Sequence, residues 1–258
     1  MNRIVSVMVV QARDRGTWLA TPAFTLGGVF AIAWCIVLIH NVLMGGVQGT
    51  YTPGLATFSI LVLVGGIGAI GGTYPFAVGF GARRRDFVAG TLAMATAVSA
   101  GWALVLGLLS LVEANLLKGW GVGMHFFYLP WFSDGSPLKQ FCWNADSACA
   151  QADPSYLRGG LPLAQFWVSF IFLLFMSVLG VLLGSIYQRF GRTGEYVFFV
   201  AIWLLLSLFL LVSLAGRWWG AILGWLGQQT AAGLAWWLIL PMALCALGSY
   251  ALLRKAAV

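Results

Sequence analysis

Charged residues are scarce in this chain. Of its 258 residues, 61% are hydrophobic and 8% are charged, whereas about a quarter of the residues in a soluble domain are charged. So few charges cannot form a water-facing surface, which excludes a soluble fold. The 33 glycines and 13 tryptophans agree, because small residues let membrane helices approach closely and tryptophan favours the headgroup interface. The composition therefore predicts an all-α membrane protein.

The motifs that would give the chain its own chemistry are missing. No Gly-Lys dipeptide occurs, so the chain lacks the phosphate-binding loop of an ATPase. It also lacks a serine elbow, paired intramembrane aspartates and a His-Glu-x-x-His sequence, and two isolated histidines cannot make a zinc site. We therefore expect no catalytic residue, metal site or cofactor in this chain, which would not be an enzyme by itself.

Ionisable residues are also missing from the middle of the apolar runs, where a proton- or sodium-coupled carrier would need them. Glu113 and His40 lie at the ends of two runs, and we expect both to be solvated helix ends. The thiols of Cys35 and Cys245 fall inside runs, where they are expected to behave as inert apolar groups. Active work would then need energy from another subunit.

Six apolar runs are long enough to cross a bilayer, which takes roughly 20 residues. Thr21-Pro22 and Thr52-Pro53 each offer a helix cap followed by proline at the first helical position. The predicted spans are residues 22–43, 53–81, 87–112, 162–187, 196–215 and 231–253. Pro75 and Pro241 lie inside spans and predict kinks.

Glycines in the second span favour close helix contact. Gly68 and Gly72 form a small-xxx-small pair, which is suited to the approach of a neighbouring membrane helix.

The basic residues set the orientation. Ten of the 14 lysines and arginines fall on one side if the N-terminus is cytoplasmic, which places both termini inside by the positive-inside rule. The net charge of +7 is spread over short connections, so it indicates contact with membrane lipids and not with nucleic acid.

The first 20 residues precede the first span. They place Met1, Ile4, Val5, Met8 and Val9 at helical spacing, which predicts an interfacial helix; a frayed start of the first span is the alternative. Polar residues Arg3, Gln11, Arg13, Asp14 and Arg15 would face water. The segment lacks the order of a signal peptide, so we expect it to be retained. The domains are thus 1–20, an interfacial helix, and 21–258, a six-helix transmembrane domain.

The connection between spans two and three is short and strongly basic. It contains Arg83, Arg84, Arg85, Asp86 and Phe87, followed by Gly90 and Thr91 at the start of the next span. This pattern resembles the first cytoplasmic loop of ABC-2 type transporter permeases, especially the small six-span permeases of actinobacteria and related bacteria. The resemblance implies the ABC-2 (type V exporter-like) permease fold. The alternative is that the arginines only anchor the chain to anionic headgroups.

In that family the loop forms a coupling helix that docks in a groove of a separate nucleotide-binding subunit. The resemblance implies that Phe80 and Phe87 act as apolar anchors and that the arginines pair with carboxylates. The implied coupling residues are Phe80, Gly81, Arg83, Arg84, Arg85, Asp86, Phe87, Gly90 and Thr91. ATP and magnesium would be bound by the partner, an ABC ATPase present in two copies, and the permease would pair with a second copy or a paralogue.

Two further connections are distinctive. The second cytoplasmic loop offers Arg189, Arg192 and Glu195 as a secondary contact with the partner, or is a plain connector. Residues 117–161 form a long exterior loop rich in aromatic residues, which suggests a folded cap. Its Cys142 and Cys149 predict a disulfide in an oxidising compartment, with two free thiols as the alternative. Residues 217–230 resemble the short re-entrant element of the family.

The sequence thus favours the permease subunit of an ABC exporter in a bacterial cell membrane. Because the spans carry no charge, the cargo is expected to be hydrophobic or amphipathic, such as a drug, lipid or peptide. A non-transporting membrane anchor, sensor or immunity subunit is the alternative, and an enzyme ranks third.

Overall fold

The computed structural model describes residues 3–14, 16–44, 50–52, 54–117, 120–127 and 162–254. This part of the chain is helical apart from two two-residue strands, β1 (Thr50–Tyr51) and β2 (Met124–His125), which pair in parallel. The helices are α1 (Arg3–Arg13), α2 (Thr21–Met44), α3 (Gly54–Gly79), α4 (Arg84–Val112), α6 (Pro162–Ala215), α7 (Trp219–Gln228) and α8 (Ala231–Arg254). Short π-helical turns, Gly16–Ala20 and Glu113–Leu117, precede α2 and follow α4.

Five of the described helices are long and apolar enough to cross a membrane. They are Gly16–Leu43, Gly54–Gly79, Arg84–Val112, Leu163–Ala215 and Ala231–Arg254. The chain is therefore an all-α membrane protein, as its composition predicts. Pro75 and Pro241 lie inside α3 and α8.

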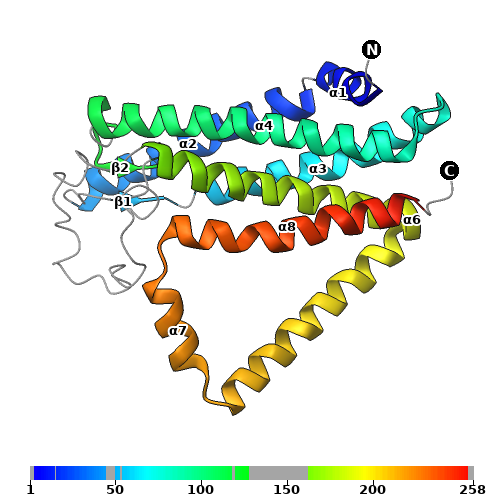
Figure 1. The fold of residues 1–258 in the computed structure, drawn as a ribbon. Helices are drawn as coiled ribbons and strands as arrows, with labels where there is room; N and C mark the ends of the chain where they lie inside the picture. Colours follow the sequence, from blue (N-terminus) through cyan, green and yellow to red (C-terminus); the bar gives the residue numbers. More distant parts are fainter. Residues whose placement is uncertain are drawn as a thin grey trace.

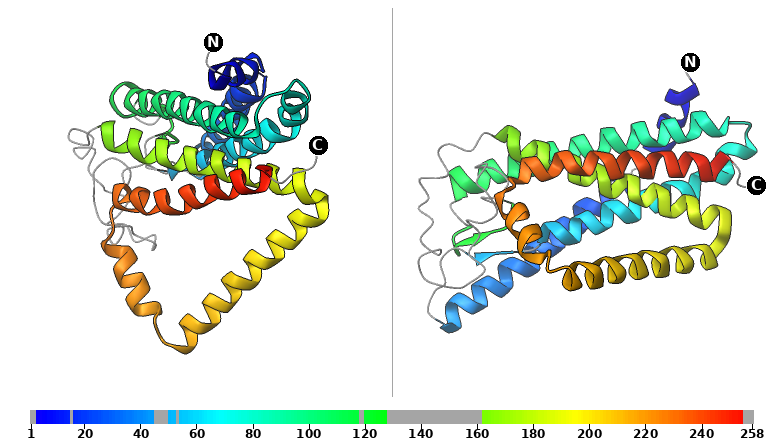
Figure 2. Two further views of the ribbon diagram at one scale, coloured as in Figure 1. Left: turned by 45° about the vertical axis from the view of Figure 1, so that its right-hand side comes forward. Right: turned by 60° about the horizontal axis from the view of Figure 1, so that its bottom comes forward.

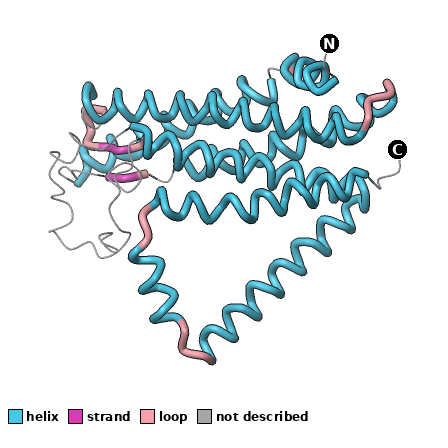
Figure 3. The backbone as a smooth tube through the Cα atoms, viewed as in Figure 1, coloured by secondary structure: helices cyan, strands magenta, loops and turns pink. Residues whose placement is uncertain are grey.

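Helix α6 accounts for the difference between five helices and six predicted spans. It bends at Gly191, where the backbone is not helical (φ 66°, ψ −163°). The chain reverses there into two straight arms (Figures 1 and 3), which we call the first arm (residues 162–190) and the second arm (residues 192–215). The predicted fourth and fifth spans fall on these two arms.

The first membrane helix begins earlier than predicted. Thr21 is not its cap, because the helical turn Gly16–Ala20 leads directly into α2. The side chain of Asp14 caps that turn instead, accepting hydrogen bonds from the backbone N–H and the hydroxyl of Thr17 at 3.2 and 2.6 Å. An aspartate at a helix start offsets the unpaired N–H groups there.

Helices α2, α3, α4, α8 and the first arm form a bundle, the second arm lies away from it, and α7 connects that arm to α8 (Figures 1 and 2). The α3–α4 turn, the bend of α6 and both chain ends lie at one end, which we call the basic end. Strands β1 and β2 lie at the opposite end, which we call the aromatic end.

Helix α1 packs against the bundle instead of presenting its whole polar face to water. Val7 belongs to a buried cluster with Tyr74, Phe87 and Leu253. Gln11, predicted to face water, is 1% exposed and donates a hydrogen bond to the hydroxyl of Thr91 at 2.8 Å. The Gln11 prediction is wrong because this side of the helix meets α4. The interfacial position of α1 stays a prediction.

Candidate functional site

The basic turn, residues 80–86, joins α3 to α4 without a helix of its own. The N–H groups of Gly81 and Ala82 donate to the carbonyls of Val78 and Ala77 at 2.9 and 3.0 Å. This pattern, with Gly81 at φ +82°, is a Schellman ending of α3. Helix α4 begins at Arg84, three residues before the predicted start of the third span. The coupling helix implied by the resemblance is therefore a tight turn here, with its arginines on or beside the first turn of α4.

An aromatic and basic surface is uncovered at this turn. Phe80 is 80% exposed and its ring lies 4.5 Å from that of Phe76, which is also exposed. Arg83 and Arg85 are exposed beside them. Asp86 lies in the first turn of α4, where a negative charge favours the helix dipole, and forms an ion pair with Arg85 at 3.4 Å.

Phe87 is not available as an apolar anchor for a partner. It is 0% exposed and its ring lies 5.3 Å from that of Tyr74. Gly90 and Thr91 are buried as well. Because α4 starts at Arg84, Phe87 and Thr91 face α3 and α1. They fix the basic turn to the bundle, and residues of the turn itself are the ones that can meet another protein.

Two hydrogen bonds tie the basic turn to the end of α8. The Tyr74 hydroxyl donates to the Leu253 carbonyl at 3.2 Å, and the Arg84 guanidinium donates to the Arg254 carbonyl at 2.9 Å. Both acceptors belong to the last turn of a helix, whose carbonyls have no partner within the helix. A pull on the basic turn would therefore be passed to α8.

Removing these two bonds should loosen α8 modestly. In the double variant Tyr74→Phe/Arg84→Met, each lost hydrogen bond is expected to cost about 1 kcal/mol, and amide exchange should rise in the last turns of α8. Arg83→Met is the matched control, because the side chain of Arg83 is exposed. Hydrogen exchange read by mass spectrometry checks this, and equal exchange in the double variant and the control would contradict it.

The predicted secondary contact surrounds the bend of α6. Arg189 lies over the ring of Phe190 at 4.8 Å, Arg192 is exposed, and Glu195 is half-buried. The bend lies at the basic end (Figure 1), so these residues share that end with the basic turn.

The close helix contact of α3 uses another glycine than predicted. A Cβ atom at Gly72 would meet nothing within 4 Å, and one at Gly68 would meet only Thr17 at 3.7 Å. By contrast, a Cβ atom at Gly66 would lie 2.4 Å from the carbonyl oxygen of Ser177, and one at Gly180 would lie 2.1 Å from that of Leu63. The backbones of α3 and the first arm of α6 therefore touch at Gly66 and Gly180.

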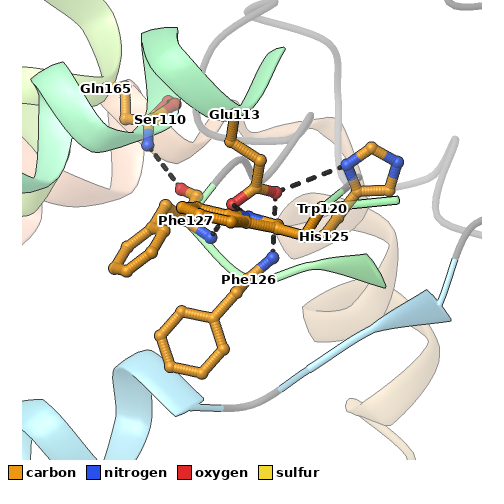
Figure 4. A network of polar contacts seen from close by, with 7 residues as sticks. All are labelled: Ser110, Glu113, Trp120, His125, Phe126, Phe127 and Gln165. Carbon is orange, nitrogen blue, oxygen red and sulfur yellow. Dashed lines mark hydrogen bonds and ion pairs between the residues drawn. The ribbon is translucent and has the colours of Figure 1, made fainter. Parts of the chain in front are cut away.

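A buried carboxylate holds the aromatic end together (Figure 4). Glu113 is 0% exposed, so its prediction as a solvated helix end is wrong. It accepts hydrogen bonds from the indole N–H of Trp120 at 2.9 Å and from the backbone N–H groups of Phe126 and Phe127 at 2.9 and 2.8 Å. Nδ1 of His125 lies 3.4 Å from Oε1, the carboxylate oxygen that also accepts from Phe126. The donors replace the water that the carboxylate has lost.

The network continues into the first arm of α6. Gln165 donates to the Phe127 carbonyl at 2.8 Å and accepts from the Ser110 hydroxyl at 2.7 Å. Both residues are buried. Neither residue stands out in the sequence, because glutamine and serine in apolar runs carry no recognisable spacing.

Helix α2 holds the same segment from the other side. Asn41 donates to the Val122 carbonyl at 2.7 Å. The ring of Phe30 lies within 6 Å of those of Trp120, Phe126 and Phe127, at 4.6, 5.3 and 5.7 Å. His40, by contrast, is exposed, as expected of a solvated helix end.

Other predicted features lie partly outside the described residues. Cys142 and Cys149 and most of the loop 117–161 fall there, so the disulfide stays a prediction. Cys35 and Cys245 are free thiols, the first exposed and the second half-buried. Among the described residues, no three His, Cys, Asp or Glu side chains gather as metal ligands would.

No family model, curated protein or solved structure matches this chain.

Proposed function

We propose that this protein is the membrane permease subunit of an ABC transporter of the ABC-2 type. Its basic turn would dock on a separate ATPase subunit, which binds ATP and magnesium. The observation that carries the proposal is the uncovered surface of Phe76, Phe80, Arg83 and Arg85 on a turn that is tied to the bundle. A surface of this kind can fill an apolar pocket and pair with carboxylates.

The rigidity of the turn supports a mechanical role. Phe87 and Thr91 anchor it inside the bundle, and Tyr74 and Arg84 link it to α8. A force applied at Phe80 would therefore reach α1, α3, α4 and α8 without being lost in a flexible loop. In this proposal the chain crosses the membrane six times, each arm of α6 crosses once, and both termini are cytoplasmic in a bacterial cell membrane.

The second arm supports pairing with a second permease. Every residue from 203 to 212 is exposed, and all but Ser207 are apolar, so the arm offers an almost wholly apolar surface to lipid or to another copy. The cargo would be hydrophobic or amphipathic, since the described residues place the one buried carboxylate, Glu113, at the end of the bundle and not along its length.

Replacing an apolar and a basic residue of the turn with acidic ones should release the ATPase. Phe80→Asp/Arg83→Glu is expected to lower the amount of co-purified ATPase, and the ATP hydrolysis of the purified complex, by about tenfold or more, because an anchor in a pocket is worth about 2 kcal/mol or more. Arg217→Glu, an exposed arginine near the start of α7, is the control. The subunits are identified and counted by mass spectrometry of the complex purified from its native membrane.

Two results would overturn the proposal. A permease that purifies alone, with no stoichiometric ATPase, favours a membrane anchor, sensor or immunity subunit. A cysteine in place of Arg83 that reacts with a membrane-impermeant maleimide on intact cells would place the turn outside, where no ATPase can reach it.

A further inference from the structure

The aromatic end is held by one short segment that touches four parts of the bundle. We call residues 120–127, together with Glu113 at the end of α4, the clamp. Residues 120–127 are hydrogen-bonded to Glu113, to Asn41 of α2 and to Gln165 of the first arm of α6. The N–H of Thr52, just before α3, donates to the His125 carbonyl at 3.1 Å. Four helix ends are thus fixed relative to one another by polar bonds that are mostly out of water.

The second arm and α7 lie outside the clamp. Ten consecutive exposed residues, 203–212, cover almost three helical turns, so no side of the arm is packed against the rest of the described chain over that length. On α8, Leu240, Leu244 and Leu247 are exposed as well. Helix α7 has no buried residue. The Trp225 ring of α7 lies 5.7 Å from that of Trp237 on α8, whereas the second arm stands apart from the bundle in the views of Figures 1 and 2.

One residue joins the two parts at the basic end. Gly191 has φ 66° and ψ −163°, a region of backbone space that is essentially restricted to glycine. A Cβ atom there would meet nothing within 4 Å, so space around the residue does not fix the angle of the bend. Hinges in proteins are typically one or a few residues of this kind, at the end of one rigid element and the start of the next.

We propose that the second arm, residues 192–215, moves about Gly191 as one body, relative to a bundle whose aromatic end the clamp keeps fixed. This inference goes beyond the proposed function and does not need the ATPase to be true. If the protein is an exporter, its path opens beside the second arm and not through the clamped end.

Distances between pairs of spin labels test both halves of the proposal. The full chain, with its four cysteines replaced by alanine, is placed one copy to a lipid nanodisc. Labels at Leu205 and Leu244 report on the arm, and labels at Ile39 and Leu108 report on the bundle; all four positions are exposed. We expect a broad or two-peaked distribution for the arm pair and a narrow single peak for the bundle pair.

Single substitutions test whether Gly191 sets the position of the arm and whether Glu113 keeps the bundle rigid. Gly191→Ala should shift the mean arm distance and leave the bundle pair unchanged, because alanine cannot keep the backbone angles of the bend. Glu113→Gln should broaden the bundle pair and leave the arm pair unchanged. Asn41→Ala, which removes one clamp bond and keeps Glu113, is a milder second variant with the same expected direction.

Three results would overturn the proposal. They are an arm pair as narrow as the bundle pair, a bundle pair as broad as the arm pair, and an arm distance that Gly191→Ala does not change. All are read on the permease without its partner, so they stand apart from the ATPase experiment.

Discussion

Gly180→Ala is expected to lower the unfolding temperature of the protein in detergent by roughly 5 °C or more. The new Cβ atom would lie 2.1 Å from the carbonyl oxygen of Leu63 and within 3.1 Å of the Cα atom of Gly66. Both are backbone atoms of α3, which cannot rotate away as a side chain can, so the two helices must separate. Overpacking of this kind costs about 1–3 kcal/mol and sometimes more, against a total stability of about 5–15 kcal/mol.

A glycine-to-alanine substitution at a site without a clash serves as the control for the general effect of replacing a glycine. Gly72→Ala is on α3, where a Cβ atom would meet nothing within 4 Å, and alanine is favoured over glycine in a helix by roughly 0.5–1 kcal/mol. It should therefore match or exceed the native protein in unfolding temperature. Size-exclusion chromatography and thermal unfolding in detergent measure both. Equal unfolding temperatures for the two variants would refute the tight contact.

The glycine contact shows where sequence reasoning reached its limit. The small-xxx-small spacing in α3 indicated Gly68 and Gly72, whereas the contact is at Gly66, which does not fit that spacing because Val62 and Ile70 lie four residues to either side of it. Helix α3 is apolar on every side, so its sequence does not reveal which side faces another helix. Only the approach of the first arm of α6, with its own Gly180, selects Gly66.

The basic turn lies where the sequence predicts it, but one of its two predicted apolar anchors is not on the outer surface. The arginines and the following Asp-Phe do connect two membrane helices. Phe80 is exposed as expected, whereas Phe87 is buried. The error has a local cause. The helix begins at Arg84 and not at Phe87, and a shift of three residues along a helix decides which side chains face the bundle.

Glu113 could not have been found from a motif. Its donors are an indole and two backbone N–H groups, seven to 14 residues further along the chain, and backbone groups leave no mark in a sequence. The available signal was the run of aromatic residues beginning at Trp120 beside the glycines Gly121 and Gly123, both of which have positive φ. That signal indicates a folded segment, and residues 120–127 form part of one, but it does not show what the segment folds around.

Glu113→Ala should therefore destabilise the protein strongly, although it lies in no recognised motif. The substitution leaves the N–H groups of Trp120, Phe126 and Phe127 without their acceptor in a buried site. Each unsatisfied buried donor costs about 1–3 kcal/mol, so the total loss is on the order of 3 kcal/mol or more. For a chain of this length that corresponds to a fall of about 10 °C in the unfolding temperature.

Glu195→Ala is the matched control, because it removes the same side chain from a half-buried position at the basic end, where a loss of less than about 1 kcal/mol is expected. Glu113→Gln should fall between the two, since its amide keeps one acceptor oxygen but turns an N–H₂ group towards the remaining donors. The order native, Gln, Ala in unfolding temperature is thus the signature of a carboxylate that works through hydrogen bonds. If Gln and Ala are equally mild, the network in Figure 4 does not hold the aromatic end together, and the clamp loses its physical basis.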